Sequence, residues 1–306
     1  MVINTKNISA SVHERLLKMA RETSRPFNEL LQLFAIERFI YRLSKSPHSE
    51  RFILKGALMF SVWSGPVSRP TMDIDLLGKI SNSLEEIQSV MRDACKMDVE
   101  DDGMLFDEKT LSAARITLDA EYEGVRVRIQ GNLGNARVSL QIDIGFGDVI
   151  VPGPGKVVYP ALLAFPSPEL NGYTMETTIS EKFQTMVKFG AVNSRMKDFY
   201  DIWMLARNYA FDGEILAEAI ERTFINRKTD LATNASIFDP SFGRDTMRQV
   251  QWQGFIRKSR LSNVPEEFVS VTADIMMFLK PPVESLASGR KFHDKWEPTG
   301  PWVPSI

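Results

Sequence analysis

Residues 71–78 read Thr-Met-Asp-Ile-Asp-Leu-Leu-Gly, and the alternation of polar and apolar side chains predicts a β-strand. Alternate side chains of a strand share a face, so Asp73 and Asp75 point one way while Ile74 and Leu76 point the other. Two neighbouring carboxylates repel each other, and a bound divalent cation would offset that repulsion. A solvated strand face is the ordinary alternative, and this stretch alone does not decide between the two.

A second stretch, residues 138–145, alternates in the same way and carries one acid. Its sequence, Val-Ser-Leu-Gln-Ile-Asp-Ile-Gly, places Asp143 on a polar face with Ser139 and Gln141. Three carboxylates on adjacent strands are typical of two-metal sites for phosphoryl transfer, in which one cation activates a hydroxyl and the other stabilises a triphosphate. We therefore expect the three aspartates to bind Mg²⁺ or Mn²⁺.

A glycine marks the turn between a predicted strand at 52–54 and a predicted helix at 57–63. The free backbone N–H groups at a helix start favour an anion, and Gly56 permits a close approach of the backbone. The turn is thus a candidate phosphate site. An ordinary turn glycine is the alternative reading.

The rest of the chain predicts helices on both sides of this α/β region, which gives an α+β fold with a mixed sheet. Ser11 and Glu14 fit a capping box at the first helix, and Glu123-Gly124 fits a hairpin turn. The expected organisation is an N-terminal helical segment at 1–50, a core at 51–150, a helical domain at 151–280 and an extended tail at 281–306.

The amino-acid composition excludes several classes of protein. A single cysteine, Cys95, excludes an internal disulfide, and with three histidines a zinc cluster is not expected. The net charge of −2, from 37 basic and 39 acidic residues, does not identify a nucleic-acid partner. The N-terminal stretch lacks the apolar run of a signal peptide, so we expect a cytoplasmic protein with no membrane partner.

Several motifs in order resemble the AbiEii/AbiGii-type nucleotidyltransferases, the toxin components of type IV toxin–antitoxin and phage abortive-infection systems. The resemblance covers roughly residues 50–205. It is carried by Lys55-Gly56-Ala57, by Arg69-Pro70-Thr71 followed by Asp73-Ile74-Asp75-Leu76-Leu77-Gly78, by Asp143, by Ser180-Glu181-Lys182-Phe183, and by Arg195-Met196-Lys197-Asp198-Phe199-Tyr200-Asp201-Ile202.

The resemblance implies a polymerase-β-like nucleotidyltransferase core with helical flanks, and an NTP as substrate. It implies an acceptor such as a tRNA end, and it allows for a cognate antitoxin. The implied catalytic residues are Asp73, Asp75, Asp143, Lys182 and Asp198, of which the first three hold the metal and Asp143 also helps to activate the acceptor hydroxyl. The implied nucleotide contacts are Gly56, Arg69, Lys182 and Asp198, with Lys182 neutralising the triphosphate.

Two other functions stay open at this point. A metal-dependent nuclease also uses clustered carboxylates, but it needs no triphosphate pocket. A nucleotide- or partner-binding module that has lost catalysis is the other alternative, because Ala57 replaces the hydroxyl residue that related enzymes carry at the phosphate turn.

Some of these residues could instead have purely structural roles. Lys182 and Asp198 could lie on solvated helix faces, and Asp201 is evenly balanced between the two readings. Arg126 and Arg128 alternate on a predicted strand, where they could guide RNA phosphates or form the charged outer face of an edge strand.

Overall fold

The computed structural model describes residues 7–64, 71–118, 122–231, 233 and 235–305, and the chain forms two compact units. The first, here called the sheet unit, comprises residues 1–147 and 155–172. The second, the helical unit, comprises residues 148–154 and 173–306. These units differ from the expected segments, because residues 1–50 and 155–172 both belong to the sheet unit.

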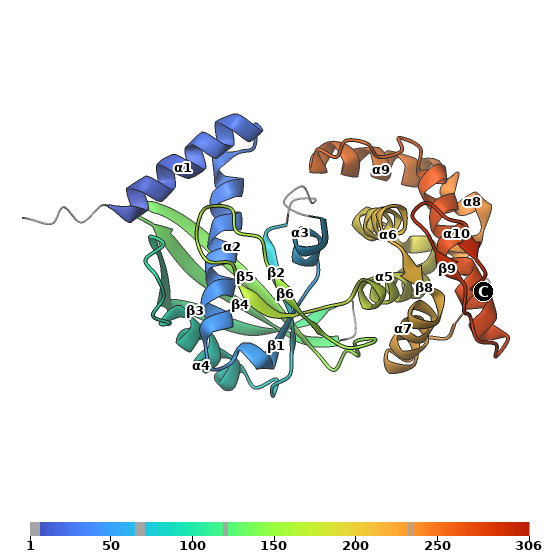
Figure 1. The fold of residues 1–306 in the computed structure, drawn as a ribbon, viewed down its shortest axis with the longest axis horizontal. Helices are drawn as coiled ribbons and strands as arrows, with labels where there is room; N and C mark the ends of the chain where they lie inside the picture. Colours follow the sequence, from blue (N-terminus) through green and yellow to red (C-terminus); the bar gives the residue numbers. More distant parts are fainter. Residues whose placement is uncertain (1–6, 65–70, 119–121, 232, 234, 306) are drawn as a thin grey trace, which may run out of the picture. The chain divides into compact units, whose positions relative to one another are not determined.

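The described part of the sheet unit contains a seven-stranded mixed sheet in the order β3-β4-β5-β2-β1-β7-β6 (Figure 1). Strand β2 pairs in parallel with β5, whereas β1–β2, β3–β4 and β4–β5 are antiparallel. The expected α+β class with a mixed sheet and helical flanks is confirmed. The strands are β1 (Phe52–Lys55), β2 (Asp73–Gly78), β3 (Met104–Leu118), β4 (Tyr122–Leu133), β5 (Ala136–Phe146), β6 (Gly155–Val158) and β7 (Glu169–Gly172).

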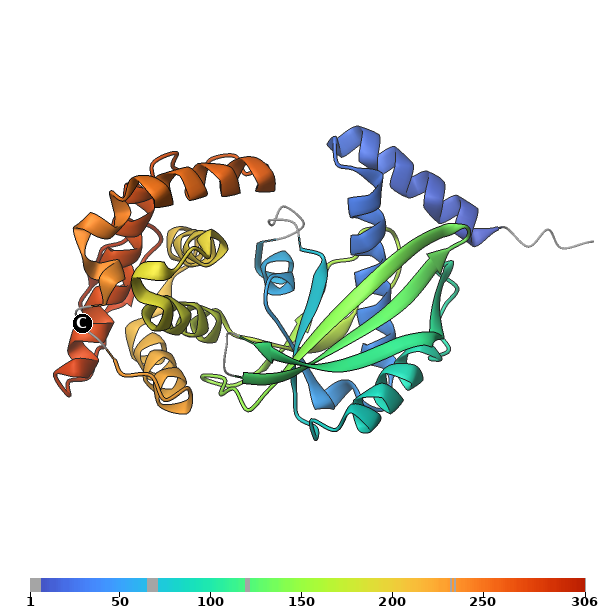
Figure 2. The same ribbon diagram turned by 180° about the vertical axis from the view of Figure 1, so that it is seen from behind.

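The two faces of this sheet differ in polarity. One face carries Ile74, Ile142 and Val127, which are fully buried. Helix α2 (Phe27–Lys45) packs on β5 and helix α4 (Leu84–Cys95) packs on β3, as both ribbon views show (Figures 1 and 2). The opposite face carries the half-buried Asp73 and Asp75, beside the buried Ile53 and Leu77. The remaining helices of the unit are α1 (Ile8–Thr23) and α3 (Leu58–Ser64).

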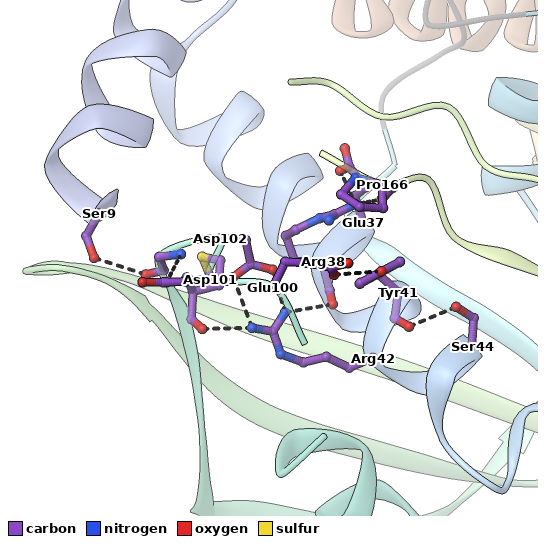
Figure 3. A network of polar contacts seen from close by, with 12 residues as sticks. Ser9, Glu37, Arg38, Tyr41, Arg42, Ser44, Glu100, Asp101, Asp102 and Pro166 are labelled. Carbon is purple, nitrogen blue, oxygen red and sulfur yellow. Dashed lines mark hydrogen bonds and ion pairs between the residues drawn. The ribbon is translucent and has the colours of Figure 1, made fainter. Parts of the chain in front are cut away.

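Helix α2 carries buried charges that bind it to neighbouring segments (Figure 3). The guanidinium of Arg42 donates to both carboxylate oxygens of Asp102, at 2.7 and 2.9 Å, and to the carbonyl oxygen of Met104 at 3.0 Å. Such a bidentate pair fixes direction as well as distance. It thereby anchors α2 to the start of β3.

One turn earlier, Glu37 and Arg38 hold the connection between β6 and β7. Both side chains are almost fully buried, and an ion pair of 2.6 Å joins them. The backbone N–H of Leu162 donates to Glu37 at 2.7 Å, and Arg38 donates to the carbonyl oxygen of Pro166 at 2.7 Å. Burial raises the pKa of Glu37 to about 7, against the opposing effect of Arg38.

Glu37 should therefore make the stability of the protein depend on pH. Between about pH 4.5 and pH 7 the folded protein holds a proton that the unfolded chain releases, so the free energy of unfolding falls as pH rises. The difference between the two pKa values corresponds to roughly 3 kcal/mol. We expect Glu37→Gln to remove this decline in urea denaturation curves, whereas the exposed-site control Glu22→Gln keeps it. A constant difference between Glu37→Gln and wild type at all pH values would contradict the assignment.

In the described part of the helical unit, α6, α7, α8 and α9 pack on α10, α5 packs on α6 and α7, and a small three-stranded sheet is also present. Helix α5 begins after Thr174, whose hydroxyl accepts a hydrogen bond from the N–H of Thr177. Among the described residues, no helix combines the length and hydropathy needed to cross a bilayer. The elements are α5 (Met175–Phe189), α6 (Met196–Asn208), α7 (Gly213–Asn226), α8 (Pro240–Gly243), α9 (Thr246–Ser259), α10 (Phe268–Ala287), β8 (Phe211–Asp212), β9 (Lys295–Trp296) and β10 (Trp302–Val303).

Two expected local signals are wrong. The capping box at Ser11 does not start α1, because Asn7 caps the helix by accepting from the N–H of Ala10 at 3.1 Å. The predicted turn at Glu123-Gly124 lies inside β4, where both residues pair with β3. Both signals are short local patterns, and such patterns do not determine the residue at which a helix or strand begins or ends.

The C-terminal tail is also more structured than expected. Pro281 and Pro282 lie inside α10, which continues to Ala287 instead of ending before them. Beyond the helix, Trp296 and Trp302 pack against Phe278, with ring centroids at 4.8 and 5.6 Å. Aromatic packing therefore fixes the tail to the helical unit.

Candidate functional site

The pairing of β2 with β5 brings the three predicted carboxylates onto one face of the sheet. In this parallel register Asp75 lies opposite Asp143, and Asp73 lies opposite Gln141. Their neighbours Ile74 and Ile142 also pair and point into the core. The period-2 alternation of each strand therefore sets the acids together on the polar face.

A cation from β4 completes this row of acids. Arg126 lies opposite Asp143, and its Nε and Nη2 donate to the two carboxylate oxygens at 2.8 Å each. Gln141 donates to one of the same oxygens at 3.3 Å. Hydrogen bonding to Asp143 raises the pKa of Arg126, and the charges of Asp73 and Asp75 act in the same direction.

The interpretation of Arg126 as part of an edge strand is wrong, whereas a contact with RNA phosphates stays a prediction. Strand β4 lies inside the sheet, between β3 and β5, so Arg126 does not lie on an edge strand. Its guanidinium is the counter-ion of the carboxylate row, whereas Arg128, two residues on, is exposed. The sequence placed Arg126 on a polar strand face but held no signal for its register with Asp143.

Gly56 accommodates one of the acids at close range. Its φ of +71° lies in the left-handed region, which favours glycine. A Cβ atom at this position would lie 2.1 Å from Oδ2 and 2.7 Å from Cγ of Asp75. Glycine is therefore needed at this turn because the Asp75 carboxylate occupies the adjacent space. The following residue, Ala57, is buried.

A second polar cluster lies in the helical unit, between α5 and α6. The ammonium of Lys182 pairs with Asp198 and with Asp201, at 2.8 Å each. Arg195 donates from Nε to the other oxygen of Asp198 at 2.7 Å. Asp198 and Asp201 are 1% and 0% exposed, so neither lies on a solvated helix face.

In the part of the chain that the structure describes, the ion pairs given above join the two cations Lys182 and Arg195 to the two carboxylates Asp198 and Asp201. Burial opposes the ionisation of Asp198, but Lys182 and Arg195 outweigh it and hold the pKa of Asp198 far below its usual range. The carboxylate is therefore charged at any physiological pH. Because two buried acids hold Lys182, its ammonium is fixed in place instead of moving freely in solvent.

A neighbouring network, which the sequence did not indicate, anchors the same part of α5. Arg227 pairs with Asp148 at 2.9 Å and with Glu181 at 3.2 Å, and it donates to Gln184 at 3.1 Å. Tyr173 donates to the other oxygen of Glu181 at 3.0 Å. Glu181 directly precedes Lys182, so this network fixes the backbone from which the lysine extends.

The donor chemistry of the carboxylate row fits a divalent cation, because Mg²⁺ and Mn²⁺ prefer carboxylate oxygens. As the side chains stand, however, no group of three acidic, histidine or cysteine side chains in the described ranges forms a metal-binding cluster. Both oxygens of Asp143 are engaged by Arg126. The expected nucleotide contact Arg69 lies outside the described residues.

Substitution of Gly56 should test its contact with Asp75. We expect Gly56→Ala to lower the free energy of unfolding by about 1–3 kcal/mol, since the new methyl group meets both backbone strain and the carboxylate. Gly134→Ala is the matched control, because Gly134 has a φ of +58° but its nearest neighbour would be 3.6 Å from the Cβ. Equal losses for the two variants in urea denaturation would show that backbone strain alone explains the effect.

A double-mutant cycle should measure the interaction of Arg126 with Asp143. Arg126→Met leaves the acids without their counter-ion, so it should destabilise the protein in the absence of metal. Asp143→Asn in the same chain removes one of the opposed charges and should restore part of that loss. We expect a coupling energy of about 1–2 kcal/mol from urea denaturation in EDTA. Additive effects would contradict the pairing.

Comparison with known proteins now adds to this geometry. Residues 38–273 match the family described as the nucleotidyl transferase AbiEii toxin of type IV toxin–antitoxin systems. Among solved structures, JHP933 from Helicobacter pylori has a TM-score of 0.47 and 12% identity, covering 85% of this chain and 95% of that one. A candidate nucleotidyltransferase of H. pylori has a TM-score of 0.44 and 12% identity, covering 90% and 96%. No curated protein matches. Since the family match spans well over half of the chain, the protein belongs to the AbiEii family of nucleotidyltransferase toxins of type IV toxin–antitoxin systems.

Proposed function

We propose that this toxin transfers a nucleoside monophosphate from an NTP to an RNA hydroxyl and releases pyrophosphate, with a tRNA end as acceptor and with Mg²⁺ or Mn²⁺ required. The observation that carries the proposal is the register of β2 with β5, which sets Asp73, Asp75 and Asp143 on one polar face. Family membership supplies the reaction class, and the acid row supplies oxygen ligands suited to these cations.

In this proposal the three aspartates hold the cations, which supply positive charge to the reacting phosphates. Asp143 has a second role in this proposal: it helps to activate the acceptor hydroxyl by accepting the proton that the hydroxyl loses as it attacks the α-phosphate. Arg126 and Gln141 orient the carboxylate of Asp143, so this acid meets an incoming hydroxyl in a defined direction. Gly56 keeps the space beside Asp75 clear.

Lys182 and Arg195 are the proposed contacts for the triphosphate. Lys182 and Arg195 carry the positive charges, and Asp198 and Asp201 hold the lysine in position. A fixed ammonium stabilises developing phosphate charge better than a mobile one, because less reorganisation is needed during the reaction. Arg69 and the backbone at Gly56 are proposed as further phosphate contacts. A cognate antitoxin is the proposed protein partner.

A labelling experiment tests the proposal directly. Purified protein is incubated with Mg²⁺, each α-labelled NTP in turn, and total tRNA. We expect label in the tRNA, its loss in EDTA, and a loss of at least about 100-fold in Asp75→Asn and Asp143→Asn, because each removes a metal ligand. The exposed-site control Asp98→Asn should label tRNA like wild type.

The other readings predict different products. Shortened RNA without label would indicate the nuclease. NTP binding without label in any product would indicate a binding module. Label in the protein alone would exclude an RNA acceptor but would keep nucleotidyl transfer.

A further inference from the structure

Helix α9 and the residues after it carry a concentration of positive charge that the overall composition hides. Residues 246–265 contain no aspartate or glutamate, whereas the whole chain has a net charge of −2. The stretch holds four cations, which are Arg248, Arg257, Lys258 and Arg260. Most of its positive charge lies at the C-terminal end of the helix.

These C-terminal cations face solvent. Trp252 is the only buried residue of α9. One side of the helix therefore packs against the unit, and the other sides face solvent. Arg257, Lys258 and Arg260 are exposed, and none forms an ion pair with an acid in the described residues. Arg248 differs, since it lies over the ring of Phe242 at 3.9 Å and pairs with Asp245 at 3.4 Å.

Two half-buried aromatic rings lie among these cations. Phe255 of α9 contacts Tyr200 of α6, with ring centroids 5.8 Å apart. Lys258 follows Phe255 by three residues and Lys197 precedes Tyr200 by three, so each lysine lies on the same side of its helix as the ring. One lysine therefore flanks each ring, whereas Arg257 and Arg260 lie further round the C-terminal end of α9, within about one and a half turns of Phe255.

In the described residues Arg257, Lys258 and Arg260 form no ion pair with the acids of the packed helices. Asp274 of α10 accepts a hydrogen bond from Trp203 at 2.9 Å and pairs with Arg207 at 3.3 Å. Helix α9 packs on α6 and α10. Asp198 and Asp201 of α6 are buried and paired with Lys182. Glu266 and Glu267, which precede α10, lie beside Gln249, since Gln249 donates to the carbonyl oxygen of Glu266 at 2.8 Å. That point is about 12 Å along α9 from Arg257.

We propose that this area binds the phosphate backbone and bases of single-stranded RNA. The α6–α9 surface, as we name it, consists of Lys197, Tyr200, Phe255, Arg257, Lys258 and Arg260. Exposed cations attract phosphates, and aromatic rings near them can stack on unpaired bases. A protein partner would require a more continuous apolar area at the centre of its interface, and the exposed apolar side chains of α9, Met247 and Val250, lie more than one turn before Phe255. The inference rests on the proposed function in taking RNA as the acceptor.

Charge reversal tests the role of the cations. The triple variant Arg257→Glu, Lys258→Glu, Arg260→Glu is compared with wild type by fluorescence anisotropy on a labelled single-stranded RNA and on tRNA. We expect its affinity to fall at least about 30-fold at low salt, and the slope of log affinity against log salt to shrink by about 2, because three phosphate contacts are lost. Phe255→Ala should weaken binding about 5- to 50-fold while the slope stays unchanged, because it removes stacking alone.

The matched control reverses three exposed cations elsewhere in the helical unit, Arg222, Arg290 and Lys291. This control should bind RNA within about threefold of wild type, and all variants should bind NTP like wild type, which shows that they are folded. If the first triple variant keeps the RNA affinity and the salt slope of wild type, the proposal that the α6–α9 surface binds RNA is overturned.

The remaining outcomes separate this inference from the proposed function. If the first triple variant binds RNA normally but no longer binds the cognate antitoxin, the surface serves a protein partner and the inference is wrong. If it binds RNA normally and still labels tRNA, the proposed function stands without this surface. If wild type binds no RNA at all, both the surface and the RNA acceptor fail.

Discussion

The parallel pairing of β2 with β5 is the constraint on which the candidate site depends. One register places Asp75 opposite Asp143 and, at the same time, buries Ile74 against Ile142. A shift of one residue would turn the apolar set to solvent and the acids into the core, so the hydrophobic effect itself enforces the arrangement of the acids. The stability of the fold and the chemistry of the site therefore have one origin.

Both units manage clustered carboxylates by placing a basic side chain among them. In the sheet unit Arg126 pairs with Asp143, one of the three acids of the row, and in the helical unit Lys182 pairs with Asp198 and Asp201. Removing one partner from such a buried pair costs far more than the pair contributes, because the remaining charge is left without compensation. These clusters consequently preorganise the charged groups before any ligand arrives.

The sequence predicted the acid-bearing strands well because their period-2 alternation follows directly from burial on one face. The link between Arg126 and Asp143 was not predictable, since it depends on a register between strands that no local pattern encodes. Helix α9 has no apolar stripe that would predict it, because Trp252 is its only buried residue. Pro281 and Pro282 concealed the continuation of α10, where packing overrides a strong local signal.

The chain passes between the two units three times, at residues 147–148, 154–155 and 172–173. Strands β6 and β7 therefore reach the sheet only after a short segment has been contributed to the helical unit. During synthesis on the ribosome, the sheet cannot be completed before residue 172 has left the exit tunnel, although most of it is encoded by residue 147. No single cut yields both units intact: a fragment ending near residue 150 would leave β1 as an unpaired sheet edge, which is a ready template for aggregation.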